Sequence, residues 1–578
     1  MTPPAADPRP APWEGADLPR GVYRWGMVFV VLLGAALRVA HLTRPFNRLM
    51  AWNEGHYAMT ALNFSRYGPW VQHNEMGIDH TFSPGVPWLI WGAFKLFGPT
   101  EWAARLPIAL AGIAAVALLA AFVRRLVRSE QIALIAAAFA AVAPGLVYYA
   151  QNVQLDTPSI CCALAGAVLM LRYQETRRRS DFVWAGVWLA MAVWFKFTAA
   201  LLYPAFLALW WPARPARPAD AAVEARTFVG LTALPSAAWI AAYWVSAFLG
   251  EQGFTSRFFH RDWDLWGIVK ALSEIPLAVE AHLFVPIFLL LLVGIPVAVR
   301  WRRRLAVIGI WCAPWVVLYL FAPWDSLVNR YYDLAATYLL VVPAALGLWT
   351  FRARQPGSTP RPPAVRTEMV PRAAFVGLAI VLALTVAYDV WDPMTDRIAR
   401  ATTAHAAPID PTPFYSARIV AALPPGPTVV DTPQTMFYAG GDSRWFYVTG
   451  GDVRWKIDEE TYDYIILNDY GHGQEPYYAI DKTLRDELAI HQYIQIAPTA
   501  WAHARTDVAD LADLREAGAG YWSPARNLPP PGHVLSQVGA WWELPPRVGR
   551  PQPPMSALDR LIDASRMHPY TMVVWTGP

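Results

Sequence analysis

An amide, a carboxylate and an imidazole stand close together in the segment "AWNEGHYAMTALNFSRYG", which runs from Ala51 to Gly68. A carboxylate such as Glu54 can take a proton from a hydroxyl group, and a protonated His56 can bind an anion. Asn53 can donate and accept hydrogen bonds, but it cannot act as a base. The segment follows the first long apolar stretch of the chain, so its chemistry depends on what lies around the end of that stretch.

Other ionisable side chains also lie next to apolar segments. Asp156 follows "YYAQNVQL", Lys196 lies in "WFKFT", Arg257 and Arg261 lie in "TSRFFHRDWD", and Arg330 lies in "APWDSLVNRYYD". Ionisable groups at a membrane boundary are costly unless they are paired or hydrated, so they indicate a site. Cations suit an anionic lipid headgroup, and a nearby carboxylate suits a reacting hydroxyl.

The composition favours a polytopic membrane protein. Of the 578 residues, 55% are hydrophobic and only 16% are charged, whereas soluble domains carry roughly 25% charged residues. No segment has the basic pattern of a nucleic-acid-binding surface. Cys161, Cys162 and Cys312 all lie in apolar segments, which excludes a disulfide framework or a zinc ribbon.

Apolar segments near the length of a membrane span, about 20 residues, recur along the chain. They predict a polytopic all-α membrane bundle of about 11–13 spanning helices. The shorter apolar segment 84–98 favours a juxtamembrane or re-entrant helix. The candidate spans are 23–43, 103–123, 131–150, 157–173, 182–195, 198–212, 228–249, 283–299, 305–322, 332–351 and 373–391.

Charge placement predicts the orientation of this transmembrane domain, residues 23–391. With a cytoplasmic N-terminus, the inner loops carry 19 Lys or Arg, and the longer outer loops carry nine, which is the positive-inside pattern. We therefore expect a multi-pass protein of the cytoplasmic (inner) membrane. Residues 1–22 are Pro-rich and favour a disordered cytoplasmic N-terminus, and residues 44–102 form a large first outer loop.

Residues 392–578 have a different character and predict an extracytoplasmic α/β domain. The segments "GPTVVDT", "YDYIILND", "HQYIQIA" and "YTMVVW" have the pattern of short strands. The segments "PFYSARIVAAL" and "MSALDRLIDASRM" have the pattern of helices. The loop "FYAGGDSRWFYVTGGD" is rich in aromatic residues that can contact carbohydrate.

Four motifs occur in order within residues 20–210: "NEGHYAMTALNFSRYG", "SPGVPWLIWGAFKLFGPTEWAARLPIALAG", "AQNVQLDTP" and "WFKFTAALLYP". Together they resemble the GT-C membrane glycosyltransferases related to protein O-mannosyltransferases and bacterial aminoarabinose transferases (family 39-like). The family pattern has an Asp-Glu pair opening the first outer loop, then G-x-x-E-x-x-x-R-L-P. A second Asp follows two spans later, and a Lys lies between two further spans.

The resemblance implies transfer of a sugar from a polyprenyl-phosphate-linked donor to an acceptor hydroxyl outside the cytoplasm, with inversion. The implied partners are the lipid-linked donor, the membrane, and a lipid, glycan or protein acceptor, without nucleic acid. No cofactor and no catalytic metal are implied. Cations would stabilise the charge growing on the leaving phosphate, and a carboxylate would deprotonate the acceptor.

The motifs carry over to this chain with two departures. Asn53 stands where the family has its first Asp, and Ser83 stands where a phosphate-binding Lys often lies. Glu54 matches the second acidic position and Asp156 matches the later Asp, so both are candidates for the base. The departures leave three alternatives open, namely a relocated base, an altered donor and a lost activity.

The resemblance also implies a set of cations for the donor phosphate. Lys196 matches the Lys of the family, and His56 stands where relatives often have Arg. Arg257, Arg261 and Arg330 are further candidates for phosphate binding.

Each candidate also has a structural interpretation. Glu54 can interact favourably with the dipole in the first turn of a helix, and Asn53 can be its N-cap. Asp156 can cap a helix that begins at Thr157, and Lys196 can extend from a helix end towards the interface. The arginines can be plain interface anchors.

Two other functions remain as alternatives. A flippase or transporter of lipid-linked sugars often shows two related halves with broken helices near the midplane, and we find no two related halves in this sequence. A non-catalytic GT-C-like assembly protein is compatible with Asn53.

Overall fold

The computed structural model describes most of the chain up to residue 238 and several later segments. All structural statements below concern these residues. They are 11, 13–14, 17–40, 42–43, 46, 51–70, 72–74, 77–78, 83–238, 241, 279, 282–283, 285–300, 302–321, 334–352, 428–430, 433–438, 445–447, 462–466, 471–472, 475–476, 488–497 and 500–503.

The chain forms two compact units, each made of separate stretches of sequence. Unit 1 consists of Met1–Ala40, Ala109–Gln151 and Leu155–Thr402. Unit 2 consists of His41–Ile108, Asn152–Gln154 and Thr403–Pro578. The first outer loop predicted from the sequence therefore belongs to the same unit as the C-terminal part.

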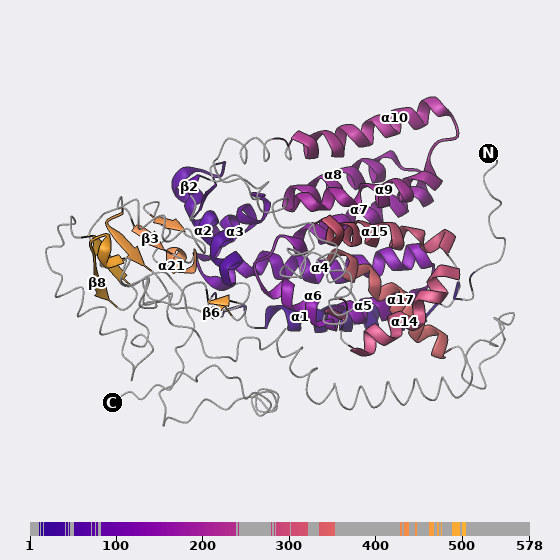
Figure 1. The fold of residues 1–578 in the computed structure, drawn as a ribbon. Coiled ribbons are helices and arrows are strands. Elements are labelled where there is room, and N and C mark those ends of the chain that lie inside the picture. Colours follow the sequence, from indigo (N-terminus) through magenta and orange to yellow (C-terminus); the bar gives the residue numbers. More distant parts are fainter. Residues whose placement is uncertain are drawn as a thin grey trace, which may run out of the picture. The chain divides into compact units, whose positions relative to one another are not determined.

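Unit 1 is helical in its described residues (Figure 1). Helix α4 begins in unit 2 and continues into unit 1. The helices are α1 (Arg20–Val39), α4 (Glu101–Val127), α5 (Glu130–Val142), α6 (Pro144–Gln151), α7 (Asp156–Thr176), α8 (Arg179–Phe195), η1 (Phe197–Leu202), α9 (Tyr203–Trp210), η2 (Trp211–Ala213), α10 (Pro218–Phe228), η3 (Val229–Ala233), α14 (Val285–Arg300), α15 (Arg302–Phe321) and α17 (Leu334–Arg352).

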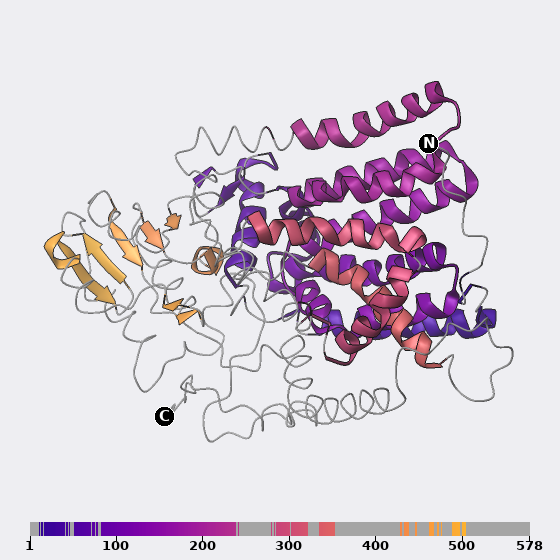
Figure 2. The same cartoon turned by 45° about the vertical axis from the view of Figure 1, so that its right-hand side comes forward.

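The most extensive helix contacts in unit 1 are those of α7 with α8 and of α14 with α17. α7 and α8 form a hairpin, and α9 packs on α7, so the three lie side by side (Figures 1 and 2). α14 and α17 approach each other through two glycines. A methyl group on Gly294 would overlap the carbonyl oxygen of Pro343, and one on Gly347 would overlap that of Leu290.

One predicted span, 131–150, is broken into α5 and α6, whose axes differ by 56°. The break lies at Ala143, whose φ of −57° and ψ of 121° are extended. Proline disfavours helical backbone in the residue before it, and Ala143 is the residue before Pro144. The guanidinium of Arg38 then donates hydrogen bonds to the carbonyl oxygens of Ala140 and Ala141, both at 2.9 Å, at the end of α5.

Helical structure is found in ten of the eleven predicted spans, of which 228–249 is described in its first half. The span 373–391 lies outside the described residues. Within the described residues, α1 and α4 are long and apolar enough to cross a membrane, and the bent pair α5–α6 is a third if it counts as one span. Five further apolar helical stretches have 10–17 residues. The prediction of a mostly helical bundle is thus confirmed. The predicted number of 11–13 spanning helices is not confirmed by the described residues.

Trp13 lies in the segment whose composition favours disorder, yet its side chain is buried. Its ring packs edge-on against Trp349 of α17, with 5.9 Å between the ring centroids. Burial of an indole contributes enough apolar area to hold a short segment against a helix.

Unit 2 combines helices with short strands. Its described helices are α2 (Ala51–Tyr67), α3 (Gly85–Phe97) and α21 (Pro433–Tyr438), and α21 packs on α2. Helix α3 occupies the segment for which we predicted a short juxtamembrane or re-entrant helix. The short strand pairs are β1 (His73–Asn74) with β2 (Gly77–Ile78), and β6 (Gly471–His472) with β7 (Glu475–Pro476).

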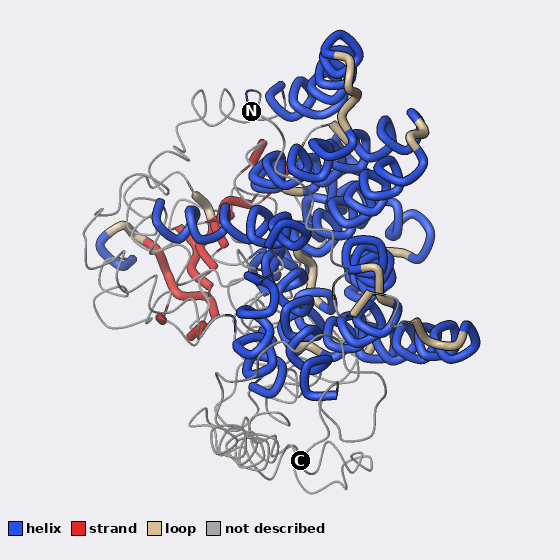
Figure 3. The backbone as a smooth tube through the Cα atoms, turned by 90° about the vertical axis from the view of Figure 1, so that its right-hand side faces the viewer, coloured by secondary structure: helices blue, strands red, loops and turns tan. Residues whose placement is uncertain are grey.

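A five-stranded mixed sheet lies in the C-terminal part, with the order β4-β3-β5-β9-β8 (strands in red in Figure 3). β3 pairs in parallel with β4 and β5, whereas β9 pairs antiparallel with β5 and β8. The strands are β3 (Thr428–Val430), β4 (Trp445–Tyr447), β5 (Tyr464–Ile466), β8 (Tyr493–Ala497) and β9 (Ala500–His503).

Three of the predicted strands are confirmed as β3, β5 and β8. β9 was not predicted, and β4 lies inside the segment that we interpreted as a loop. Its three aromatic residues favour a strand, but the flanking glycines obscured that signal. The strand at 570–575 and the helices at 413–423 and 555–567 lie outside the described residues.

Candidate functional site

Glu54 is fully buried in the first turn of α2 and is bound by Arg105 of α4. The Nε of Arg105 lies 2.7 Å from Oε1 of Glu54, and its Nη2 lies 2.8 Å from Oε2. This is the two-pronged geometry that gives strong, directional pairing between arginine and a carboxylate. The backbone N–H of Val153 donates a third hydrogen bond to Oε1 at 3.1 Å. Within unit 2, Glu54 therefore links α2 to α4 and to the short stretch Asn152–Gln154.

The remaining contacts of Arg105 extend this link to the C-terminal part. Its Nη1 donates to the carbonyl oxygen of Leu42 at 3.0 Å. Its guanidinium carbon lies 5.1 Å from the ring centroid of Phe46, within the range of a cation–π contact. Phe46 in turn packs against Phe437 of α21, with ring centroids 4.9 Å apart.

The other predicted residues of the first outer loop lie near Glu54 in sequence. α2 begins at Ala51, so Asn53 lies inside its first turn, and the interpretation of Asn53 as the N-cap is wrong. Asn53 is half-buried. His56 is buried and its ring lies edge-on to Tyr57, with centroids 4.9 Å apart. Ser83 is buried just before α3.

In unit 1, Asp156 and Lys196 form a buried ion pair. The Nζ of Lys196 lies 2.6 Å from Oδ1 of Asp156, and the two side chains are 8% and 5% exposed. The pair exists because α7 begins at Asp156 and α8 ends at Phe195, so the hairpin brings both residues to the same end. Asp156 is the first residue of α7 and Leu155 is its N-cap, so the interpretation of Asp156 as the cap is wrong.

Neighbouring hydroxyl groups fix this end of the hairpin. Ser159 donates a hydrogen bond to the carbonyl oxygen of Ala192 at 2.8 Å, which joins α7 to α8. Thr157 donates to the carbonyl oxygen of Tyr149 at 3.2 Å. The buried hydroxyl of Thr198, two residues after Lys196, has no hydrogen-bond partner among the described residues.

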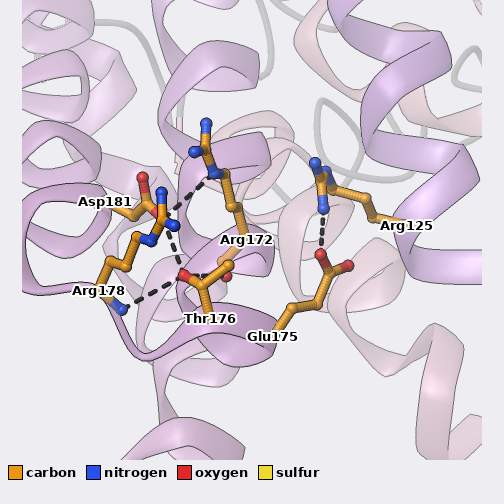
Figure 4. Close-up of polar contacts among 6 residues, drawn as sticks. All are labelled: Arg125, Arg172, Glu175, Thr176, Arg178 and Asp181. Atoms are coloured by element: carbon orange, nitrogen blue, oxygen red, sulfur yellow. Dashed lines mark hydrogen bonds and ion pairs between the residues drawn. The ribbon is translucent and has the colours of Figure 1, made fainter.

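The opposite end of the same hairpin carries arginines (Figure 4). There, Nε of Arg172 lies 3.3 Å from Oδ2 of Asp181, and Arg125 of α4 pairs with Glu175. α7 has 21 residues, which at 1.5 Å per residue is roughly 31 Å, about the thickness of the hydrocarbon core of a bilayer. The Asp156–Lys196 pair and the arginines thus lie at opposite ends of α7.

The structure thus brings Asp156 and Lys196 together in unit 1 and places Asn53, Glu54 and His56 in unit 2. Arg105 was missed as the partner of Glu54, although it is the arginine of the R-L-P motif and its position was visible. Arg257, Arg261 and Arg330 lie outside the described residues. The described residues contain no group of three or more His, Cys, Asp or Glu side chains that could hold a metal ion.

Residues 79–239 match the model of a family described as dolichyl-phosphate-mannose-protein mannosyltransferase. The match contains Asp156 and Lys196, whereas Asn53, Glu54 and His56 precede it. A comparison with curated proteins gives no match.

Solved structures of ArnT show the same fold. ArnT from Cupriavidus metallidurans has a TM-score of 0.50 at 15% identity in both its apo state and its complex with undecaprenyl phosphate. The alignments cover 85% and 86% of this chain and 99% of ArnT. The oligosaccharyltransferase of Archaeoglobus fulgidus has a TM-score of 0.45 at 14% identity, over 73% of this chain. This chain spans 59% of the length of that protein.

The fold and the apolar helices define the class, which is a helical membrane protein with the GT-C fold. The resemblance to the family 39-like GT-C superfamily is supported by the match over residues 79–239, which contain three of the four motifs.

Proposed function

We propose that this protein transfers a sugar from a polyprenyl-phosphate-linked donor to an acceptor hydroxyl at the outer face of the cytoplasmic membrane. The observation that carries the proposal is the buried Lys196–Asp156 pair at one end of the α7–α8 hairpin. The pair lies within the segment that matches the mannosyltransferase family. A cation and a carboxylate in direct contact are the two groups that this chemistry needs.

Lys196 is the proposed contact for the donor phosphate. Its ammonium group is neutralised by Asp156. A phosphate that replaces the carboxylate keeps the ammonium paired, and it leaves the buried carboxylate of Asp156 without its cation. Stabilising the negative charge that grows on the departing phosphate is the main electrostatic task of the reaction.

Asp156 is the proposed base, because the exchange at Lys196 would free one of its oxygens. Asp156 then takes the proton of the acceptor hydroxyl. The acceptor oxygen forms a bond to the anomeric carbon while the bond from that carbon to the phosphate oxygen breaks. The polyprenyl phosphate leaves with the bonding electrons and needs no proton from the protein. A single displacement of this kind inverts the anomeric centre.

Glu54 is proposed as a positioning residue rather than the base. Three N–H donors already bind its carboxylate, and it is fully buried. One of these donors is Val153, which belongs to the stretch that leads along the chain to Asp156. Asn53 and His56 are proposed to contact the substrates by hydrogen bonds. Arg257, Arg261 and Arg330 remain proposed phosphate-binding residues.

The test uses membranes containing the full chain, supplied with radiolabelled undecaprenyl-phosphate mannose, glucose, arabinose or aminoarabinose and a cell-envelope fraction as acceptor. The readout is label transferred and undecaprenyl phosphate released. Replacing Asp156 with Asn should lower transfer by about 10²–10⁴-fold. Replacing Lys196 with Met should lower it by about 10²–10³-fold. D181N is the matched control, because Asp181 forms the ion pair at the opposite end of the hairpin.

Two outcomes would favour another function. Equal transfer by wild type and D156N would remove Asp156 from the role of base. Movement of the labelled lipid across liposome membranes without transfer, unaffected by D156N, would support a flippase. Absence of both activities with every donor would support a non-catalytic assembly protein.

A further inference from the structure

The turn between α7 and α8 contains three consecutive arginines, Arg177, Arg178 and Arg179, of which Figure 4 shows Arg178. Arg177 has a φ of 58°, in the left-handed region. The Thr176 hydroxyl lies 2.9 Å from Oδ2 of Asp181 and accepts a hydrogen bond from the backbone N–H of Arg178 at 3.3 Å. The turn is therefore held by its own hydrogen bonds, and Arg178 and Arg179 project from a defined backbone.

A second turn, between α4 and α5, lies beside the first. The ion pair of Arg125 with Glu175 joins the end of α4 to the end of α7 (Figure 4). Arg128 and Arg178 each lie three residues after a member of this ion pair, Arg125 and Glu175 respectively. Arg128 also has a left-handed backbone, with a φ of 56°. Both turns thus keep an arginine at a position where glycine would be less strained.

The two turns carry far more positive than negative charge. They hold seven arginines and three carboxylates, namely Arg124, Arg125, Arg128, Arg172, Arg177, Arg178 and Arg179 with Glu130, Glu175 and Asp181. Each carboxylate already pairs with one arginine, that is with Arg124, Arg125 or Arg172.

Three of the remaining arginines are exposed and available. Arg177 is engaged, because it donates to the carbonyl oxygen of Ala213 and its guanidinium lies 5.9 Å from the ring centroid of Tyr173. Arg128, Arg178 and Arg179 are exposed and have no ion-pair partner among the described residues.

The position of this cluster relative to a bilayer follows from nearby tryptophans. Trp184 and Trp211 are 56% and 60% exposed. They lie near the same end of the hairpin, because Trp184 is in the second turn of α8 and Trp211 adjoins Ala213, the partner of Arg177. Exposed tryptophans near helix ends favour the interface between hydrocarbon and headgroups. The phosphate groups of lipids lie at that depth.

We propose that Arg128, Arg178 and Arg179 form a binding site for the phosphate headgroup of an anionic phospholipid. Arginine binds phosphate oxygens through two parallel N–H donors, which lysine cannot do. The three belong to a group of seven arginines in the two turns, and juxtamembrane clusters of four to eight basic residues are a known signature of such lipids. The site lies at the end of the hairpin opposite Asp156 and Lys196, and it does not depend on the proposed transferase activity.

The test uses the full chain purified in a neutral detergent. Dioleoylphosphatidylglycerol or dioleoylphosphatidylcholine is added in mixed micelles, and the rise in thermal unfolding temperature gives the affinity. Phosphatidylglycerol should stabilise the wild type saturably, and phosphatidylcholine should not. The triple variant R128Q/R178Q/R179Q should bind phosphatidylglycerol at least tenfold more weakly. The triple lysine variant, which keeps the charge, should fall between the two.

The matched control is R214Q/R217Q/R226Q, which removes the same charge from exposed arginines around α10. It should change the affinity less than threefold. Equal weakening in both triple variants would reduce the effect to general electrostatics and overturn the site. An equal saturable rise in unfolding temperature with inorganic phosphate would assign the site to a soluble anion. That result would overturn the proposal that the ligand is a lipid. Unfolding temperatures without lipid, which should agree between the variants, exclude misfolding as the cause.

Discussion

The ammonium group of Lys196 lies 2.6 Å from a carboxylate oxygen of Asp156, although 40 positions separate the two residues in the chain. The contact joins the start of α7 to the end of α8, at the end of the hairpin away from the connecting turn. The same charged pair therefore contributes to the local structure and to the proposed chemistry. These two contributions can be separated by experiment.

Breaking this pair by a single substitution should destabilise the protein more than removing both partners. D156N or K196M alone leaves one buried group without its partner, at a cost of about 3–5 kcal/mol. The double variant D156N/K196M should lose less than the sum of the single losses. Denaturant-induced unfolding in detergent micelles measures the free energies. Additive losses would mean that the two side chains do not interact.

The Glu54–Arg105 pair should be far more sensitive than a comparable pair at the surface. E54Q or R105K should cost about 3–5 kcal/mol, because either change leaves a fully buried group incompletely paired. E175Q breaks the Arg125–Glu175 pair, whose side chains are 32% and 50% exposed, and should cost roughly 0–1 kcal/mol. The same unfolding measurement compares the three variants. A loss for E54Q as small as that for E175Q would contradict the structural role of Glu54.

Alanine at Gly294 or Gly347 should disrupt the contact between α14 and α17. Each new methyl group would overlap a carbonyl oxygen of the opposite helix, and overpacking of this kind costs about 1–3 kcal/mol. G309A in α15 is the control, since a methyl group there meets no atom within 4 Å. It should be neutral or slightly stabilising, because alanine is the better helix former. Thermal unfolding of the three variants decides the point.

Replacing Gln434 with an apolar residue should increase the stability of the protein. Its side chain is fully buried in α21, and its amide nitrogen and oxygen both lack hydrogen-bond partners among the described residues. An unsatisfied buried polar group costs about 1–3 kcal/mol, so Q434M should recover part of that free energy. Q434E, which buries a charge, should do the opposite. A clear loss of stability in Q434M would show that the amide does form hydrogen bonds.

Tyr464 of β5 should make the stability of the protein sensitive to alkaline pH. Burial raises the pKa of its phenol above 10.0. The neutral phenol is therefore favoured in the folded state, and its contribution is complete below pH 10. It is lost at about 1.4 kcal/mol per unit as the pH rises through 10 towards the folded-state pKa.

The variant Y464F tests this expectation. It removes the titrating group, so its stability relative to the wild type should increase as the pH rises above 10. Unfolding curves at pH 8 and pH 10.5 measure the difference. A constant difference between the two proteins at both values would show that Tyr464 titrates equally in both states.

The helices were predictable because apolar segments of sufficient length leave few alternatives. Their irregularities were less predictable. Pro144 gave a visible signal for the break between α5 and α6, but its 56° bend also depends on Arg38, which reaches the end of α5 from another helix. The strand β4 has three residues, and so short a run is fixed by its neighbours β3 and β5 rather than by its own sequence.

The candidate site was predictable in its residue types but not in its pairings. The motifs identified Glu54, Asp156 and Lys196, and the order of spans indicated that Asp156 and Lys196 would lie at the same end of their helices. Nothing local in the sequence links Glu54 to Arg105, because 51 positions separate them. Their contact depends on the tertiary structure, which brings the first turn of α2 to the first part of α4.

The composition of unit 2 has a consequence for the way the protein is made. Its core joins residues 41–108 to α21 through the contact of Phe46 with Phe437. The ribosome must therefore synthesise more than three hundred intervening residues, including nearly all of unit 1, before that core can close. Until then, α2 and its neighbours lack part of their packing partners, and we expect them to need a chaperone. A chain that terminates before α21 should therefore lose part of the core of unit 2.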